Sequence, residues 1–137
     1  MRIGVPKEIK DQEFRVGLTP ASARELIAHG HEVYVEKNLG AGIGFDDAAY
    51  KAVGAKVLNT AKEVFAKGEM IIKVKEPQAS EYDLIEKRHT VFTYLHLAAE
   101  PKLTKALQKS KCTAIAYETV TDKFGGLPLL APMSDVA

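Results

Sequence analysis

The chain has 137 residues, of which 46% are hydrophobic and 27% charged, and its formal net charge is +1. This is the size and composition of one globular domain with a single core, and the low charge gives no reason to expect a nucleic-acid or anionic-membrane partner. No apolar run approaches the roughly 20 residues of a membrane-spanning helix, and Lys7 and Glu8 make the N-terminus unlike a signal peptide. The single cysteine, Cys112, leaves no internal disulfide and fits a cytoplasmic protein.

The first half of the chain predicts two strands and three helices. The clearest helix signals surround residues 19–30, where Thr19 can cap the N-terminus, Pro20 occupies the first helical position and Gly30 ends the helix. In chain order we expect a strand at 2–6, the helix at 19–30, a strand at 31–38, a helix capped by Asp46 and a helix at 60–68.

The second half continues the alternation of strands and helices. We expect strands at 69–77, 90–97 and 112–120, a helix at 100–110 and the beginning of a helix within 130–137. Alternating strands and helices indicate an α/β fold with a mostly parallel sheet and helices on both faces. The nearly continuous apolar strands agree, because parallel strands are usually covered on both sides.

Polar side chains gather where the predicted strands end. Open parallel sheets bind ligands beyond the carboxyl ends of their strands, and the polar residues expected at that edge are Glu8, Arg15, Lys75, Tyr94, His96 and Glu118. An arginine offers a two-pronged clamp for a carboxylate, and a lysine offers a compact positive charge. A histidine beside them can transfer a proton near neutral pH. The set therefore predicts a site for a small organic anion.

Each of these residues also has a purely structural interpretation. Lys75 can form a solvated charge pair with Glu76, and His96 can be a hydrogen-bonded structural histidine. Arg15 can fix its loop through a salt bridge, and Tyr94 can serve partly in packing.

The glycine-rich segment LGAGIGFDD, residues 39–47, is not a good dinucleotide fingerprint. Gly40, Gly42 and Gly44 follow a predicted strand, but Phe45 stands where a G-x-G-x-x-G motif needs its last glycine. We interpret the segment as a turn before a capped helix. No histidine or cysteine spacing indicates a metal site, and we expect Cys112 to be inert packing.

Six uninterrupted segments resemble the N-terminal part of the alanine dehydrogenase family. They are MRIGVPKEIKDQEFRVGLTP (1–20), GHEVYVEKNLGAGIGFDDAAY (30–50), IIKVKEP (71–77), FTYLHLAAEP (92–101), AIAYETV (114–120) and LPLLAPMSDVA (127–137). The superfamily also includes the nicotinamide nucleotide transhydrogenase subunit, whose opening is similar. The resemblance implies a Rossmann-like fold.

The resemblance also implies roles for single residues. Arg15 and Lys75 match residues that hold pyruvate or the carboxylate of L-alanine, and His96 matches the catalytic acid/base. Further positions match contacts to the substrate pocket, at Tyr94 and Met133, and to the NAD cofactor, at Ser134.

Family members continue into a second domain that binds NAD. The resemblance thus implies that residues 1–137 are an N-terminal substrate domain that ends before the NAD-binding domain. We expect an NAD-dependent reaction that interconverts L-alanine with pyruvate and ammonium, and a homo-oligomer when the protein is full length. We expect no turnover and no tight NADH binding from these residues alone. Two alternatives remain, which are a transhydrogenase-type subunit and a non-catalytic module for carboxylate binding or oligomerisation.

Overall fold

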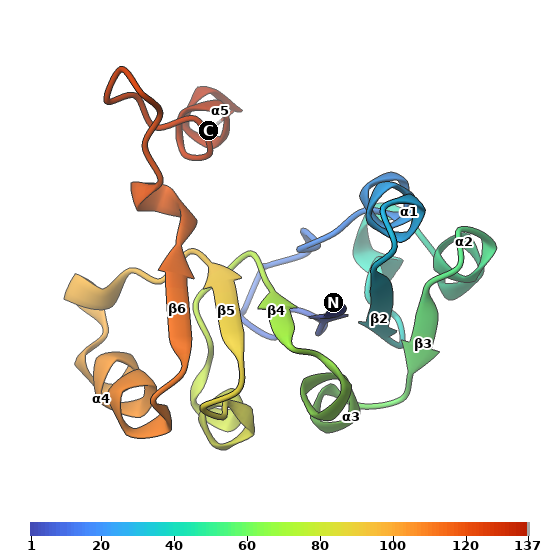
Figure 1. The fold of residues 1–137 in the computed structure, drawn as a ribbon, viewed down its shortest axis with the longest axis horizontal. Helices are drawn as coiled ribbons and strands as arrows, with labels where there is room; N and C mark the ends of the chain where they lie inside the picture. The colour runs from blue at the N-terminus through green and yellow to red at the C-terminus, as the bar shows by residue number, and fades with distance from the viewer. Residues whose placement is uncertain (137) are drawn as a thin grey trace.

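The computed structural model describes residues 1–136 and contains one sheet of six strands, all paired in parallel (Figure 1). The strands lie side by side in the order β3-β2-β1-β4-β5-β6. Their bounds are Arg2–Val5 for β1, Glu32–Glu36 for β2, Lys56–Leu58 for β3, Met70–Ile72 for β4, Thr90–Thr93 for β5 and Thr113–Ala116 for β6. The predicted α/β class with a parallel, Rossmann-like sheet is confirmed.

Five α-helices and four short 3₁₀ helices connect or follow the strands within residues 1–136. The α-helices are α1 (Pro20–Ala28), α2 (Asp47–Ala52), α3 (Ala61–Lys67), α4 (Pro101–Ser110) and α5 (Ala131–Val136). The 3₁₀ helices are η1 (Ala41–Ile43), η2 (Ala79–Leu84), η3 (Leu97–Ala99) and η4 (Tyr117–Thr119). Among the described residues, no helix is long and apolar enough to cross a membrane.

Local sequence signals explain where three of the helices begin. Thr19, Asp46 and Thr60 each accept a hydrogen bond from a backbone N–H three residues ahead, at 2.9–3.2 Å. Such caps satisfy backbone donors that a helix cannot pair internally, and each contributes about 1 kcal/mol. The predicted starts of α1, α2 and α3 are therefore confirmed.

Helices lie on both faces of the sheet and form two separate core clusters (Figure 1). On one face, α1 and α2 cover β1, β2 and β3, with Val5 and Val35 fully buried beneath them. On the other face, α3, η2 and α4 cover the sheet, and Leu103 of α4 is fully buried. Burial of a large aliphatic side chain stabilises the fold by about 1.5–3 kcal/mol.

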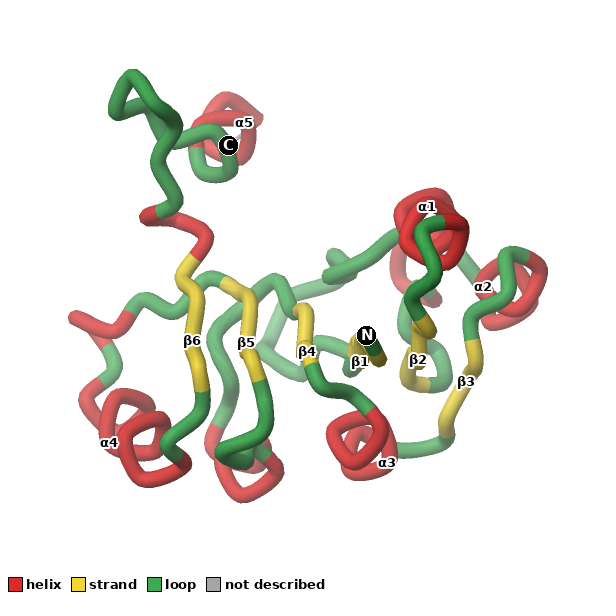
Figure 2. Tube along the Cα trace, viewed as in Figure 1, coloured by secondary structure: helices red, strands yellow, loops and turns green. Residues whose placement is uncertain are grey.

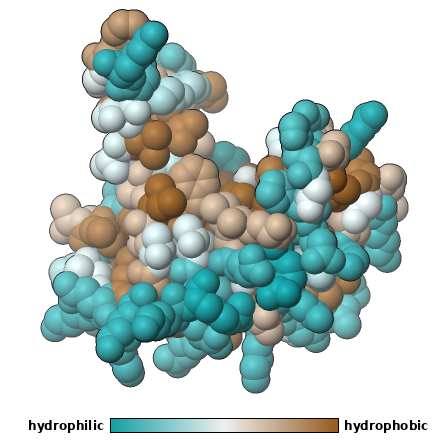
Figure 3. Space-filling view, in the orientation of Figure 1, coloured by the Kyte–Doolittle hydropathy of each residue, from teal (hydrophilic) through white to brown (hydrophobic). Residues whose placement is uncertain are grey.

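One part of the sheet is less covered than the sequence predicts. Ile72, Phe92 and Ile115 lie side by side in the register of β4, β5 and β6, and Ile115 is 38% exposed. Figure 3 shows apolar residues gathered on this side of the molecule, and Leu129 lines a pocket together with Ile72 and Phe92. Within residues 1–136, β6 is therefore not fully covered on this face.

Several strand boundaries also differ from the sequence prediction. Lys56–Leu58 forms the edge strand β3, where the sequence predicts only the approach to a helix. A three-residue edge strand is too short to show the alternation of apolar and polar residues that identifies a strand in a sequence. The strands β4, β5 and β6 end at Ile72, Thr93 and Ala116, earlier than predicted. Side chains bind backbone N–H groups beyond β4 and β5, and β6 is followed directly by η4. Figure 2 shows the connection between β1 and α1 as loop throughout.

Candidate functional site

The carboxyl ends of β1, β4, β5 and β6 meet at one edge of the sheet, as parallel pairing requires. Lys75 lies three residues beyond β4, and Tyr94 and His96 follow β5. Glu118 lies in η4 directly after β6, and Arg15 lies in the loop that connects β1 to α1. The topology thus brings the predicted site residues to one edge.

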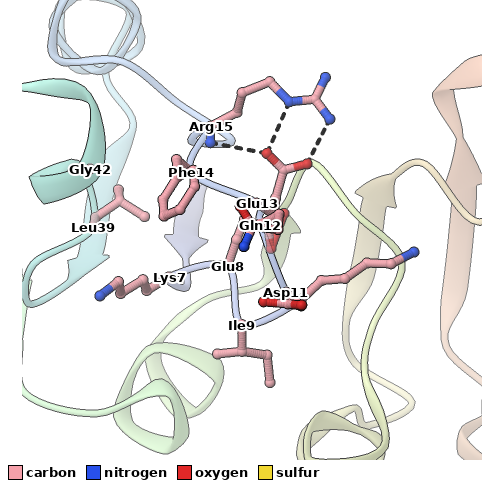
Figure 4. Close-up of a pocket in the computed structure, with 11 residues that line it drawn as sticks. Lys7, Glu8, Ile9, Asp11, Gln12, Glu13, Phe14, Arg15, Leu39 and Gly42 are labelled. Carbon is pink, nitrogen blue, oxygen red and sulfur yellow. Dashed lines mark hydrogen bonds and ion pairs between the residues drawn. The ribbon is translucent and has the colours of Figure 1, made fainter.

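The guanidinium of Arg15 is held on one side by Glu13 (Figure 4). Its Nε donates to Glu13 Oε2 at 2.9 Å and its Nη2 donates to Oε1 at 2.6 Å. The Arg15 side chain is 51% exposed while that of Glu13 is only 6% exposed. Burial would raise the pKa of Glu13, but the hydrogen bonds and charge of Arg15 outweigh it and lower that pKa. The salt bridge that the structural interpretation expected therefore exists, and it leaves Nη1 and one N–H of Nη2 without a carboxylate partner among the described residues.

Arg15 and Lys75 line one pocket of about 460 Å³ beneath the 10–15 loop. Lys75 is half-buried, and it is not paired with its neighbour Glu76. The Glu76 carboxylate instead pairs with Lys10. The interpretation of Lys75 and Glu76 as a solvated charge pair is therefore wrong for the described residues. Two cationic side chains around one small space favour an anion between them.

Tyr94 and Met133 form an apolar side of the site. The Tyr94 hydroxyl lies 2.7 Å from Met133 Sδ, and Arg15 Nη1 lies 3.8 Å from the same sulfur. The Tyr94 ring also packs edge-on against Tyr117, with ring centroids 4.5 Å apart. Burial raises the pKa of both Tyr94 and Tyr117, so each phenol stays protonated at neutral pH. Met133 therefore reaches Arg15 and Tyr94, although 118 and 39 residues separate it from them.

His96 lies on a turn and not on the strand. Its backbone is in the left-handed region, with φ 49° and ψ 42°, which is uncommon for a residue other than glycine. The Glu118 carboxylate accepts the N–H of Leu95 at 3.1 Å and that of His96 at 3.4 Å. The exposed imidazole lies edge-on to Tyr94 with centroids 6.4 Å apart. Tyr94 and His96 are thus neighbours because of this turn, and not because side chains alternate along a strand.

Ser134 follows Met133 on α5 and is exposed. Its backbone N–H donates to Leu130 O at 3.1 Å as part of the helix. The structure brings Arg15, Lys75, Tyr94, His96 and Met133 to one edge, and Ser134 lies next to the last of these.

Sequence reasoning missed Glu13, and it placed Glu8 on the rim although the side chain is buried. The spacing of Glu13 two residues before Arg15 is the local signal that could have revealed the pair.

The glycine-rich segment 39–47 forms η1 and the turn before α2. A Cβ on Gly40 would lie 2.6 Å from the Phe45 carbonyl oxygen, so the missing side chain makes room for the segment's own backbone. This packing does not form a cradle for a dinucleotide pyrophosphate. Within residues 1–136, no group of three His, Cys, Asp or Glu side chains is placed to hold a metal ion.

His89, His29 and Cys112 lie outside the site. His89 is 1% exposed, accepts the Glu86 N–H at 2.9 Å and lies 2.7 Å from Phe65 O. His29 ends α1. Cys112 is half-buried and packs at the margin of the core near α4.

Comparison with known proteins identifies the family. The sequence model described as "Alanine dehydrogenase/PNT, N-terminal domain" matches residues 4–137. The chain belongs to this family. Alanine dehydrogenases from Methanococcus maripaludis, Halomonas elongata and Mycolicibacterium smegmatis are 56%, 55% and 50% identical over all 137 residues. The chain spans 37% of the length of each of these relatives.

Solved structures of the alanine dehydrogenase/PNT family agree with the sequence comparison. An L-alanine dehydrogenase superposes on the whole chain with a TM-score of 0.97 and 54% identity, and the chain covers 38% of it. A transhydrogenase from Sinorhizobium meliloti matches 90% of the chain with a TM-score of 0.81 and 25% identity, over 35% of its own length. Both branches of the family therefore share this fold.

Proposed function

We propose that residues 1–137 are the substrate-binding domain of an NAD-dependent alanine dehydrogenase. The reaction is L-alanine + H₂O + NAD⁺ ⇌ pyruvate + NH₄⁺ + NADH + H⁺. One observation carries the proposal: the Arg15 guanidinium is held by Glu13, and Arg15 and Lys75 line the same pocket. The identity of 50–56% to alanine dehydrogenases supports the choice of substrate.

Arg15 and Lys75 bind and orient the substrate. Glu13 occupies Nε and one side of Nη2, so the Nη1–Nη2 end of Arg15 remains for the two oxygens of a substrate carboxylate. Lys75, which lines the same pocket, holds the keto oxygen of pyruvate. Its positive charge stabilises negative charge that develops on that oxygen in the transition state. Fixed orientation of the substrate supplies several kcal/mol of barrier reduction.

His96 transfers protons at the same edge of the sheet, beside Tyr94. One imidazole nitrogen removes a proton from the water that attacks the imine carbon, and the resulting carbinolamine carries the new hydroxyl. The same nitrogen then returns the proton to the amine, and the C–N bond breaks so that ammonia leaves. The carbinolamine hydroxyl becomes the keto oxygen of pyruvate, and its proton passes to the ammonia, which becomes ammonium. The turn held by Glu118 keeps the ring exposed and beside Tyr94. Tyr94 and Met133 exclude water from one side of the substrate.

NAD is the cofactor that the proposal requires, but residues 1–136 do not fit a dinucleotide. Phe45 closes the glycine-rich turn, and Ser134 is a single exposed contact position. The residues of this chain therefore account for substrate binding and proton transfer. They do not account for binding of the cofactor, which we assign to a domain outside this chain.

The alternative functions have less support. A transhydrogenase-type subunit is expected to be more similar in sequence to a transhydrogenase than to an alanine dehydrogenase. The sequence identity is instead 25% to the transhydrogenase structure and 54% to the alanine dehydrogenase structure. A non-catalytic carboxylate-binding module would not need a histidine beside Tyr94 at this edge of the sheet. Homo-oligomer formation and a cytoplasmic location stay predictions from the sequence.

The test is the alanine-dependent formation of NADH by the complete gene product that carries this segment. We expect L-alanine to drive NADH formation, and we expect Lys75→Ala to reduce kcat/KM strongly. Lys56→Ala is the matched control, because Lys56 is exposed and pairs with Glu32 on the far edge of the sheet. The proposal is wrong if L-alanine gives no NADH, or if both lysine variants keep the wild-type constants.

A further inference from the structure

A buried ionic network lies directly beneath the candidate site. The side chains of Lys73, Glu8 and Glu81 are only 1–3% exposed. The Lys73 ammonium forms an ion pair with Glu8 and lies 3.3 Å from Glu81 Oε2. A buried charge costs several kcal/mol unless it is paired and hydrogen-bonded. The steps proposed above use none of these three residues.

Glu8 also binds the backbone that carries Lys75. Its Oε2 faces the Lys73 ammonium, while its Oε1 accepts the N–H of Val74 at 2.5 Å and the N–H of Lys75 at 2.7 Å. One carboxylate from the loop after β1 therefore binds three donors in the segment that follows β4.

The other backbone groups around Lys75 are bound as well. The Lys75 carbonyl accepts the Thr93 hydroxyl at 2.9 Å. The Tyr117 hydroxyl lies 3.0 Å from Lys73 O and 3.1 Å from Val74 O. Lys75 lies beyond the end of β4, so its N–H depends on Glu8 and not on a strand neighbour. Both polar backbone groups of Lys75 are thus held by side chains of other elements.

We propose that Glu8, held in place by Lys73, is a positioning residue that fixes the backbone of Lys75 so that the Lys75 ammonium meets the substrate oxygen. This inference rests on the proposed function, because it assigns a purpose to the placement of Lys75. A displacement of about 1 Å in a group that stabilises the transition state can cost about 100-fold in rate. Glu8 itself does not touch the substrate, since its carboxylate is buried against Lys73 and two amides.

Two variants of Glu8 separate positioning from simple structural support. Glu8→Asp keeps the charge opposite Lys73 but shortens the side chain by one methylene, which withdraws the carboxylate from the amides. Glu8→Gln keeps an acceptor oxygen but leaves Lys73 with Glu81 as its remaining counter-ion. Glu36→Gln is the matched control, because Glu36 accepts the Lys7 N–H at 2.9 Å in the same loop without touching Lys75.

The experiment is a double-mutant cycle in the complete gene product, with kcat and KM for pyruvate measured below the melting temperature of every variant. We expect Glu8→Asp to lower kcat by about 10- to 100-fold. We expect the same change to have less than about a threefold effect in a protein that already carries Lys75→Ala, because coupled residues are not additive. Glu36→Gln should keep the wild-type kcat. If Glu8→Asp fails to fold, Glu8→Gln is taken through the same cycle.

The outcomes distinguish the inference from the function on which it rests. Equal fold-losses from Glu8→Asp in the wild-type protein and in the Lys75→Ala variant would overturn the inference and leave alanine dehydrogenase activity intact. A lower melting temperature with an unchanged kcat would overturn it too. A wild-type protein with no alanine-dependent activity would overturn the proposed function and this inference together.

Discussion

Replacement of Arg15 by lysine keeps the positive charge and removes the planar fork, so it tests how the site recognises a carboxylate. Two of the five N–H groups of Arg15 are committed to Glu13, at 2.9 Å and 2.6 Å. A lysine ammonium is a single point charge and cannot hold Glu13 and both oxygens of a substrate carboxylate at once. One lost charge-assisted hydrogen bond costs about 1.5–3 kcal/mol, which corresponds to about a 10- to 150-fold rise in KM.

The assay is the reductive amination of pyruvate by the complete gene product, followed by NADH absorbance over a range of pyruvate concentrations. Arg88→Lys is the control, because Arg88 binds Glu86 and the carbonyl oxygens of Phe65 and Gly68 away from the site. We expect the control to lower the melting temperature and to keep KM. An Arg15→Lys protein with wild-type KM would refute the carboxylate clamp.

Three further predictions concern single side chains. His96→Ala should lower kcat by about 10²- to 10⁴-fold with little change in melting temperature, because the ring is an exposed proton-transfer group; the opposite pattern would make His96 structural. The pKa of Glu13 is lowered below its ordinary value of 4.5 despite burial, because Arg15 hydrogen-bonds its ionised form. The Glu13–Arg15 pair therefore stabilises the folded state fully above about pH 4.5, and this stabilisation is lost as the pH falls through the lowered pKa. Urea titrations should therefore give a larger free energy of unfolding for the wild-type protein than for Glu13→Gln at about pH 6, and this difference should shrink toward about pH 3. A difference in unfolding free energy that does not change with pH would contradict the ion pair. Tyr50→Phe should reduce the free energy of unfolding by about 1–3 kcal/mol, because it leaves the buried Leu18 carbonyl without its donor at 2.8 Å. In a spectrophotometric titration of the wild-type protein, the Tyr50 phenol should stay protonated until about pH 12, because burial raises its pKa to about 12.

The sequence predicts most of the fold because the decisive signals are local. Thr19, Asp46 and Thr60 bind amides three residues away, so a short window contains both partners. The edge strand β3 was missed because three residues, Lys56–Leu58, become a strand only by pairing with β2. The early end of β5 has the same origin, since Glu118 binds Leu95 and His96 from 22–23 residues away.

The sequence predicts which residues form the site, but it does not predict the buried side chains that hold them in place. Arg15, Lys75 and His96 are predicted to lie together because the carboxyl ends of parallel strands meet at one edge of the sheet, and ligands bind there. The Lys73–Glu8 pair joins residues 65 positions apart, and no sequence window contains both. Lys73 nevertheless carries a signal, because a lysine within an apolar segment needs a buried counter-ion.

The most direct test of the site is a crystal structure of the complete gene product with pyruvate bound. We predict that the pyruvate carboxylate lies end-on against Nη1 and Nη2 of Arg15, with Glu13 still on the other side of the guanidinium. The keto oxygen should lie within hydrogen-bonding distance of Lys75 Nζ, with the His96 ring beside the reacting carbon. Pyruvate bound away from Arg15 and Lys75, or bound with its carboxylate toward His96 alone, would contradict the proposed site.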